Sequence, residues 1–178
     1  MDLSNIRTLT ADEIEVRIGT KAKSGSGASL LLYKNSRVDM AILDELVGPM
    51  NWQRDHKELK GVIYCGVAIK NENEWIWKWD AGVESNTEPQ KGEASDSFKR
   101  AGFKWGIGRE LYTSPKIAVL NEAIGGVNSR ESNGRKFWNL NKPYQTFYVK
   151  SLEYNSNNEI SKLTISDSKG NVIWSNEH

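Results

Sequence analysis

The chain has 178 residues, of which 38% are hydrophobic and 26% are charged, and its formal net charge is +1. This composition is typical of a soluble globular protein and argues against a disordered chain. No apolar run approaches the roughly 20 residues that span a bilayer. The only cysteine is Cys65, which excludes an internal disulfide and a multi-cysteine zinc site. The first residues lack the basic start and apolar stretch of a secretion signal, so we expect a cytoplasmic protein.

The first two thirds of the chain contain segments with strand and helix periodicity. Apolar residues recur at a period of two in the strand segments and at three or four residues in the helical segments. In chain order we expect a short helix capped at Thr10, strands over 14–18 and 30–33, and a helix whose N-cap is Ser36 and which ends at Gly48. Strands over 52–58, 62–70 and 74–81 follow, and then a helix that starts near Pro89 and is closed by Gly106. Three strands followed by a helix with an apolar stripe predict a β-β-β-α core, an antiparallel sheet covered by helices.

The last third of the chain has a different character. Residues 121–143 are polar and rich in Gly and Asn, which predicts an irregular connection. Three strand candidates follow, over 146–154, 160–166 and 172–175. We therefore expect an α+β protein with a core domain over 1–120 and a strand-rich carboxyl-terminal extension over 121–178.

Two segments are locally basic although the chain is nearly neutral. A positive surface attracts phosphate within a Debye length of about 8 Å. The alternative is that both segments are solvated faces without a ligand. The candidate DNA-binding residues are Arg17, Lys21, Lys23, Lys34, Arg37, Lys99, Arg100, Lys104 and Arg109.

The most specific pattern lies between residues 91 and 112. Arg100 and Lys104 are four residues apart on the helix surface, so they repel, and an anionic ligand such as phosphate would relieve this repulsion. The run Asp96-Ser97-Phe98-Lys99-Arg100-Ala101, followed by an aromatic residue and a Gly-rich exit, resembles the helix of the Rad fifty-two family of single-strand annealing proteins. The likeness extends from about Thr10 to Tyr112, and it is especially close to the phage-encoded branch.

The resemblance implies a non-enzymatic protein that binds single-stranded DNA and anneals complementary strands in recombination and repair. It implies assembly into a homo-oligomeric ring with a positively charged groove. Lys99 and Arg100 match the basic pair of that groove, Arg17 matches another groove arginine, and Lys104 lies near a further basic position. A phage exonuclease or a host single-strand-binding protein is the expected further partner, and no cofactor, metal or membrane is expected.

The competing function is a passive single-strand-binding protein that protects DNA without annealing it. The chain lacks the Gly-x-x-x-x-Gly-Lys-Ser/Thr phosphate loop, which argues against ATP-driven strand exchange. A metal-dependent nuclease would need acids that converge on a metal, and Asp55 and Glu58 are too close together in the sequence for that arrangement. Asp80, Glu84 and Glu93 could hold a divalent ion, although ion pairs or capping are the simpler interpretation.

Three tryptophans alternate along one expected strand. Trp75, Trp77 and Trp79 lie at a period of two, so they share one face of the sheet. A stripe of this kind is a core, an interface between subunits or a platform on which bases stack. The sequence leaves these three alternatives open.

Overall fold

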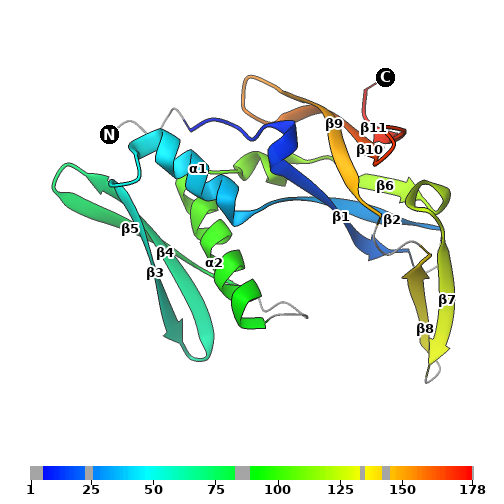
Figure 1. Ribbon diagram of the computed structural model, residues 1–178, viewed down its shortest axis with the longest axis horizontal. Helices are drawn as coiled ribbons and strands as arrows, with labels where there is room; N and C mark the ends of the chain where they lie inside the picture. The colour runs from blue at the N-terminus through cyan, green and yellow to red at the C-terminus, as the bar shows by residue number, and fades with distance from the viewer. Residues whose placement is uncertain (1–5, 23–25, 83–88, 133–134, 142–144, 178) are drawn as a thin grey trace. The chain divides into compact units, whose positions relative to one another are not determined.

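A computed structural model describes residues 6–22, 26–82, 89–132, 135–141 and 145–177 (Figure 1). The expected α+β class with mostly antiparallel strands is confirmed. The chain forms two compact units that interleave along the sequence. Unit 1 comprises residues 1–8 and 34–109, and unit 2 comprises residues 9–33 and 110–178. Within the described ranges, no helix has the length and apolar character that a bilayer crossing requires.

Unit 1 is a three-stranded antiparallel sheet with one face covered by a helix. Strands β3 (Trp52–Leu59), β4 (Val62–Asn71) and β5 (Glu74–Ala81) pair in chain order. Helix α2 (Pro89–Trp105) packs against β4 and β5, and helix α1 (Ser36–Val47) packs against α2. The predicted β-β-β-α order is therefore confirmed.

The core of unit 1 forms where alternate residues of β4 meet the apolar stripe of α2. Cys65, Val67, Phe98 and Ala101 are fully buried. The indole nitrogen of Trp105 donates a hydrogen bond to the Val67 carbonyl over 2.9 Å, so the end of α2 is fixed to the central strand. Side chains of β3 complete this face of the sheet.

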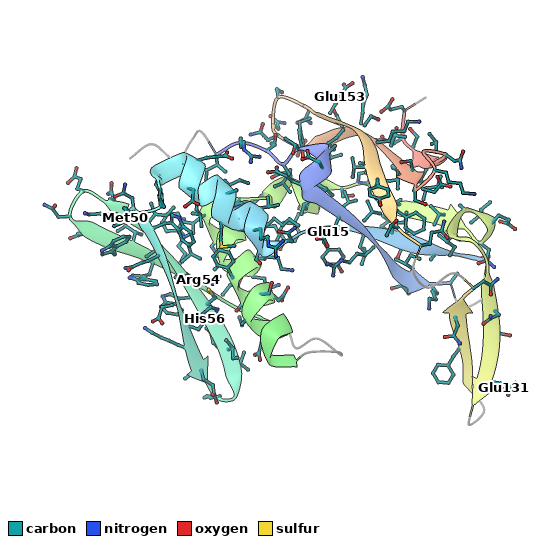
Figure 2. The ribbon with its side chains drawn as sticks, viewed as in Figure 1. Glu15, Met50, Arg54, His56, Glu131 and Glu153 are labelled. Carbon is teal, nitrogen blue, oxygen red and sulfur yellow. The ribbon has the colours of Figure 1, made fainter. Side chains whose placement is uncertain are left out.

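The even-numbered residues of β3 point toward α2. The Trp52 and Phe98 rings stack with centroids 6.2 Å apart. Arg54 lies on β3 (Figure 2), and its guanidinium is 5.0 Å from the centroid of the Phe98 ring. The imidazole Nε2 of His56 lies 3.4 Å from the Ala94 carbonyl. This alternation assigns one face of the sheet to α2 and leaves the odd-numbered side chains of β3 and β5 on the other face.

Helix α1 begins one residue earlier than predicted. The N-cap is Asn35 instead of Ser36, because the Asn35 side-chain oxygen accepts hydrogen bonds from the backbone nitrogens of Arg37 and Val38. The helix ends as expected at Gly48, whose φ of 80° a residue with a Cβ adopts only with strain.

Unit 2 contains a six-stranded sheet with the strand order β11-β10-β9-β1-β2-β6 and a separate two-stranded hairpin, β7-β8. Its elements are η1 (Ala11–Glu13), β1 (Ile14–Lys21), β2 (Gly27–Lys34), η2 (Arg109–Thr113), β6 (Ile117–Leu120), η3 (Glu122–Ile124), β7 (Val127–Ser132), β8 (Arg135–Leu140), β9 (Phe147–Tyr154), β10 (Ile160–Asp167) and β11 (Val172–Ser175). The predicted connection over 121–143 was wrong where β7 and β8 pair, because backbone pairing holds this hairpin without an alternating apolar pattern.

The expected division at residue 120 differs from the division of the structure. Strand β1 pairs with β9, with Val16 opposite Phe147, so the carboxyl-terminal strands continue the sheet of β1 and β2. The Tyr154 hydroxyl donates to the Leu9 carbonyl over 2.8 Å, and the Leu9 nitrogen donates to Oε1 of Glu110 over 2.6 Å. Residues 121–178 are therefore not a separate extension, since they build one unit with residues 9–33.

Candidate nucleic-acid interface

Two basic side chains of α2 share a single carboxylate of β5. Nη2 of Arg100 lies 3.5 Å from Oδ1 of Asp80, and Nζ of Lys104 lies 3.7 Å from Oδ2. The Arg100 and Lys104 side chains are 43% and 55% exposed, whereas Asp80 is 18% exposed. Because one negative charge serves two cations over long distances, this cluster retains a net positive charge that faces solvent.

The Arg100 guanidinium is only partly satisfied by the protein. Its Nε is buried and has no hydrogen-bond partner among the described residues. The 3.5 Å contact with Asp80 is longer than the 2.7–2.9 Å that charge-assisted hydrogen bonds of this kind adopt. The planar fork of Arg100 can therefore exchange Asp80 for another oxyanion at small cost.

Lys99 occupies the adjacent position on α2 and has a weaker internal partner. Its Nζ lies 3.9 Å from Oδ1 of Asp96, one turn earlier on the same helix. Its side chain is 19% exposed, so most of it is covered, and its positive charge also lowers the pKa of the buried Asp39. The run predicted from the sequence thus places three cations along one stretch of α2.

The carboxyl end of α2 is capped by two further cations. Arg109 donates from Nε to the Phe103 carbonyl over 2.7 Å and from Nη2 to the Lys104 carbonyl over 2.9 Å. Nζ of Lys78 donates to the same Lys104 carbonyl over 3.1 Å and lies 4.2 Å from the centroid of the Trp105 ring. Cations stabilise this end of a helix because its last carbonyls lack intrahelical partners. Arg109, which was predicted to bind DNA, therefore caps the carboxyl end of α2.

Lys78 is a basic residue of this site that was not predicted from the sequence. The signal that could have found it is its place between Trp77 and Trp79, since alternation turns it to the face opposite the tryptophans and toward α2. We call Lys78, Lys99, Arg100, Lys104 and Arg109 together the α2 basic cluster. All five belong to unit 1.

Lys34 is buried, so the prediction that it belongs to an exposed DNA-binding surface was wrong. It is 2% exposed, and its ammonium forms a close ion pair with the buried carboxylate of Asp39. A side chain at Gly102 would collide with Asp39, and one at Gly108 would collide with the stem of Lys34, so both glycines make room for the pair. Burial raises the pKa of Asp39 to about 6, and the nearby Lys34 limits the rise.

The other candidates lie on different elements. Arg37 is exposed in the first turn of α1. Arg17 lies in unit 2, where it pairs with Glu15 and its guanidinium carbon lies 5.2 Å from the centroid of the Tyr33 ring. Lys23 and the acidic candidate Glu84 lie outside the described residues.

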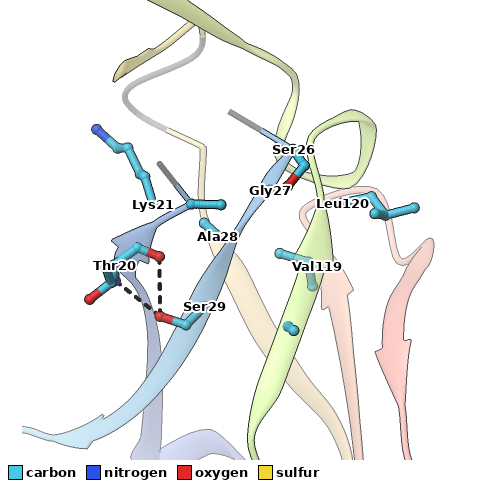
Figure 3. A pocket seen from close by; sticks show the side chains of 10 residues that line it. Thr20, Lys21, Ser26, Gly27, Ala28, Ser29, Val119 and Leu120 are labelled. Carbon is cyan, nitrogen blue, oxygen red and sulfur yellow. Dashed lines mark hydrogen bonds between the residues drawn. The ribbon is translucent and has the colours of Figure 1, made fainter. Parts of the chain in front are cut away.

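Lys21 lines a cavity of about 360 Å³ in unit 2, between β1, β2 and β6 (Figure 3). The Ser29 hydroxyl accepts from the Thr20 nitrogen over 3.0 Å and approaches the Thr20 carbonyl at 3.3 Å. Small and apolar side chains make most of the wall, and among the described residues that line it Lys21 is the charged one. The described part of this wall therefore does not present the set of cations that would bind a phosphate backbone.

The acidic residues do not assemble a metal site in the described part of the chain, which holds no group of three or more His, Cys, Asp or Glu side chains suited to a metal ion. Asp55 pairs opposite Gly66 and Glu58 opposite Ile63, so alternation places the two acids on opposite faces of the sheet. Oε1 of Glu93 accepts a hydrogen bond from the Ile63 nitrogen over 2.8 Å. Asp80 and Glu93 therefore have ion-pair and hydrogen-bond roles.

Comparisons of this chain with models of protein families, with curated proteins and with solved structures give no match. The assignment of a function therefore depends on the chemistry of the site.

Proposed function

We propose that this protein binds single-stranded DNA through the α2 basic cluster and anneals complementary strands without ATP, as an oligomer that acts in recombination and repair. The observation that carries the proposal is the shared carboxylate of Asp80, which leaves Arg100 and Lys104 exposed and incompletely neutralised. The pattern from Asp96 to Ala101, which resembles that of single-strand annealing proteins, supports the same function.

A phosphate is the ligand that fits these cations. An arginine fork binds two phosphate oxygens at once, and neighbouring lysines add point charges along the strand. Exposed ion pairs contribute only about 0–1 kcal/mol, so a phosphate displaces Asp80 from Arg100 and Lys104 at little cost. A polyanion that contacts several of these cations also releases condensed counterions, which favours binding.

Annealing requires that bound strands keep their bases available for pairing. Contacts between cations and phosphates position a strand without reading its bases. A protein that holds DNA in this way can bring two complementary strands together, and nucleotide hydrolysis supplies nothing to the pairing itself. We therefore favour annealing over simple protection of the strand as the function.

The test measures binding and annealing with the same variants. Fluorescence anisotropy of a labelled oligo(dT) over a series of salt concentrations gives affinity and salt dependence. We expect Lys99→Ala, Arg100→Ala and Lys104→Ala each to weaken binding and to lower the slope of log K against log salt by about 0.7 per lost phosphate contact. Lys169→Ala, which removes an exposed lysine in a turn of unit 2, is the matched control and should leave both quantities unchanged.

Annealing is followed by energy transfer between two labelled complementary strands, in EDTA and without ATP. Rapid duplex formation that slows in the three α2 variants supports the proposal. Binding without faster annealing indicates a passive protector, and a strict requirement for ATP or metal indicates an enzyme. Unchanged binding in all three variants would remove the α2 basic cluster from the interface.

A further inference from the structure

The sheet of unit 1 carries an aromatic surface on the face that α2 does not cover. Trp75, Trp77 and Trp79 lie on this face of β5, opposite Lys70, Ala68 and Gly66 of β4. Side chains directly opposite one another in an antiparallel pair share a face, so the three indoles lie over a strip with two very small residues. We call the three tryptophans, with Lys57 and Lys70 beside them, the Trp face.

Two indole rings of the Trp face, those of Trp77 and Trp79, are stacked nearly parallel. A Cβ at Gly66 would lie 2.5 Å from the Trp79 ring, so this ring rests directly on the backbone of β4. The Trp77 ring stacks on Trp79 with centroids 5.3 Å apart and an interplanar angle of 20°. Ala68, which pairs with Trp77, is fully buried. The small residues of β4 thus leave room for the Trp77 and Trp79 rings to lie close to the sheet as an aromatic platform.

The outer part of this platform is accessible and carries two lysines and one acid, Asp55, which lies opposite Gly66 on the same face. Trp75 is 36% exposed, and Trp77 and Trp79 are partly exposed. The Lys57 ammonium lies 4.4 Å from the centroid of the Trp79 ring, and Lys70 is the cross-strand partner of Trp75. A core between copies of a chain is depleted of charged residues, whereas this surface combines indoles with two lysines at its edges.

Flat indoles beside cations are the combination that binds single-stranded nucleic acid. Bases stack on aromatic rings regardless of their sequence, and lysines contact the phosphates between them. We propose that the Trp face is a base-stacking surface for single-stranded DNA, with Trp75 as its exposed end. Stacking occupies the flat face of a base and leaves its Watson–Crick edge available, so it is compatible with annealing.

This inference rests on the proposed function and adds a contact of a different kind. The α2 basic cluster recognises phosphates, and the Trp face recognises bases. The two contacts can therefore be separated by their chemistry, because a strand that lacks bases keeps its phosphates.

The experiment compares an oligo(dT) with an abasic strand of equal length for wild type, Trp75→Ala and Trp75→Phe. We expect Trp75→Ala to lower the affinity for oligo(dT) by roughly 5-fold or more, the lower end of what one stacked base contributes. The affinity for the abasic strand and the salt slope should stay unchanged, and Trp75→Phe should recover part of the loss. Tyr148→Ala removes an aromatic ring that is 53% exposed on β9 and is the matched control.

A second measurement locates the contact without a substitution. An oligonucleotide that contains 5-iodouracil is irradiated in complex with wild-type protein, and cross-linked peptides are identified by mass spectrometry. The tryptic peptide over residues 71–78 contains Trp75 and Trp77, and we expect the cross-link there.

The outcomes separate this inference from the proposed function. If Trp75→Ala leaves the affinity for oligo(dT) unchanged, the stacking inference is overturned and the proposed function stands. The same holds if Trp75→Ala lowers the affinity for the abasic strand as much as that for oligo(dT). A Trp75→Ala protein whose mass by sedimentation falls together with its affinity shows that the Trp face joins copies of the chain, which also overturns the inference. Failure of the wild type to bind either strand removes the proposed function itself.

Discussion

The Arg100 guanidinium and the Asp80 carboxylate form a contact of 3.5 Å between α2 and β5, and Asp80 also serves Lys104 at 3.7 Å. This relationship makes Asp80 an internal competitor of any phosphate that approaches these two cations. The acid keeps like charges on α2 compatible in the unbound protein, and a bound strand would take over that function.

Neutralising Asp80 should strengthen DNA binding. In Asp80→Asn, a phosphate no longer competes with the carboxylate, so we expect affinity for single-stranded DNA to rise by up to about 5-fold, equivalent to an exposed ion pair of up to about 1 kcal/mol. The measurement is fluorescence anisotropy at fixed salt. Glu153→Gln is the matched control, because it removes the same charge from an exposed acid that pairs with Lys162 in unit 2. An equal rise in affinity in both variants would mean that DNA binding depends on the net charge of the protein and not on the position of Asp80.

Replacing Phe98 should destabilise unit 1. Its side chain is fully buried beneath Trp52, so Phe98→Ala should lower the free energy of unfolding by about 3–5 kcal/mol. Urea unfolding followed by tryptophan fluorescence measures this, and five of the seven tryptophans lie in unit 1. Tyr148→Ala, an exposed aromatic position, should change the free energy of unfolding by no more than about 0.5 kcal/mol. A loss below about 1 kcal/mol for Phe98→Ala would contradict the packing described for α2.

The packing between Phe98 and the sheet is also the part of the fold that the sequence predicts well. The apolar stripe of α2 and the period-two patterns of β3, β4 and β5 are local signals, and the elements they predict are present. The pairing of β1 with β9 joins Val16 to Phe147, and no local pattern specifies which distant strand completes a sheet. The compact units therefore divide the chain at other places than residue 120.

The candidate site was also predicted only in part from the sequence. Arg100 and Lys104 are exposed on α2 as the helix periodicity predicts, because their positions relative to Phe98 and Ala101 turn them away from the core. The Lys99 side chain is 19% exposed, so it is covered more than the periodicity predicts. The burial of Lys34 was not predictable from charge, since a lysine at the end of a strand has the same sequence signature whether it is solvated or paired. Its partner Asp39 lies five residues later in another element, and only the fold brings the two together.

The ion pair of Lys34 and Asp39 leads to a prediction with a defined pH dependence. In Lys34→Met, burial still raises the pKa of Asp39, and the nearest charge that lowers it is lost while that of Lys99 remains, so this pKa should rise above its present value of about 6. A carboxyl whose pKa is higher in the folded state than in the unfolded chain favours folding at low pH, and this contribution is lost as the pH rises from about 4 through the folded-state pKa. We expect Lys34→Met to cost about 3–5 kcal/mol near pH 8 and clearly less near pH 5.

The double variant Lys34→Met with Asp39→Leu provides the control. It removes both charges from the interior, and replacement of a buried pair by apolar residues is often neutral or stabilising. Its free energy of unfolding should return toward that of the wild type, and the difference between them near pH 8 should be small. Equal losses for Lys34→Met at pH 5 and pH 8 would show that the carboxylate of Asp39 is not the origin of the cost.

Cys65 offers a direct report on whether DNA binds unit 1. The thiol is fully buried on β4, and burial raises its pKa to about 11, so the reactive thiolate is scarce and inaccessible in the folded protein. Alkylation at pH 8 should then proceed only when unit 1 opens. A ligand that binds the folded state alone at 100 times its Kd stabilises that state by about 2.7 kcal/mol, so saturating oligo(dT) should slow the labelling of Cys65 by roughly 100-fold. Mass spectrometry after timed exposure to iodoacetamide measures the rate.

A variant with Lys99, Arg100 and Lys104 all replaced by Ala should show little slowing at the same DNA concentration. Equal slowing in that variant would place the strand elsewhere on unit 1, and no slowing in the wild type at saturation would mean that the strand does not stabilise this unit.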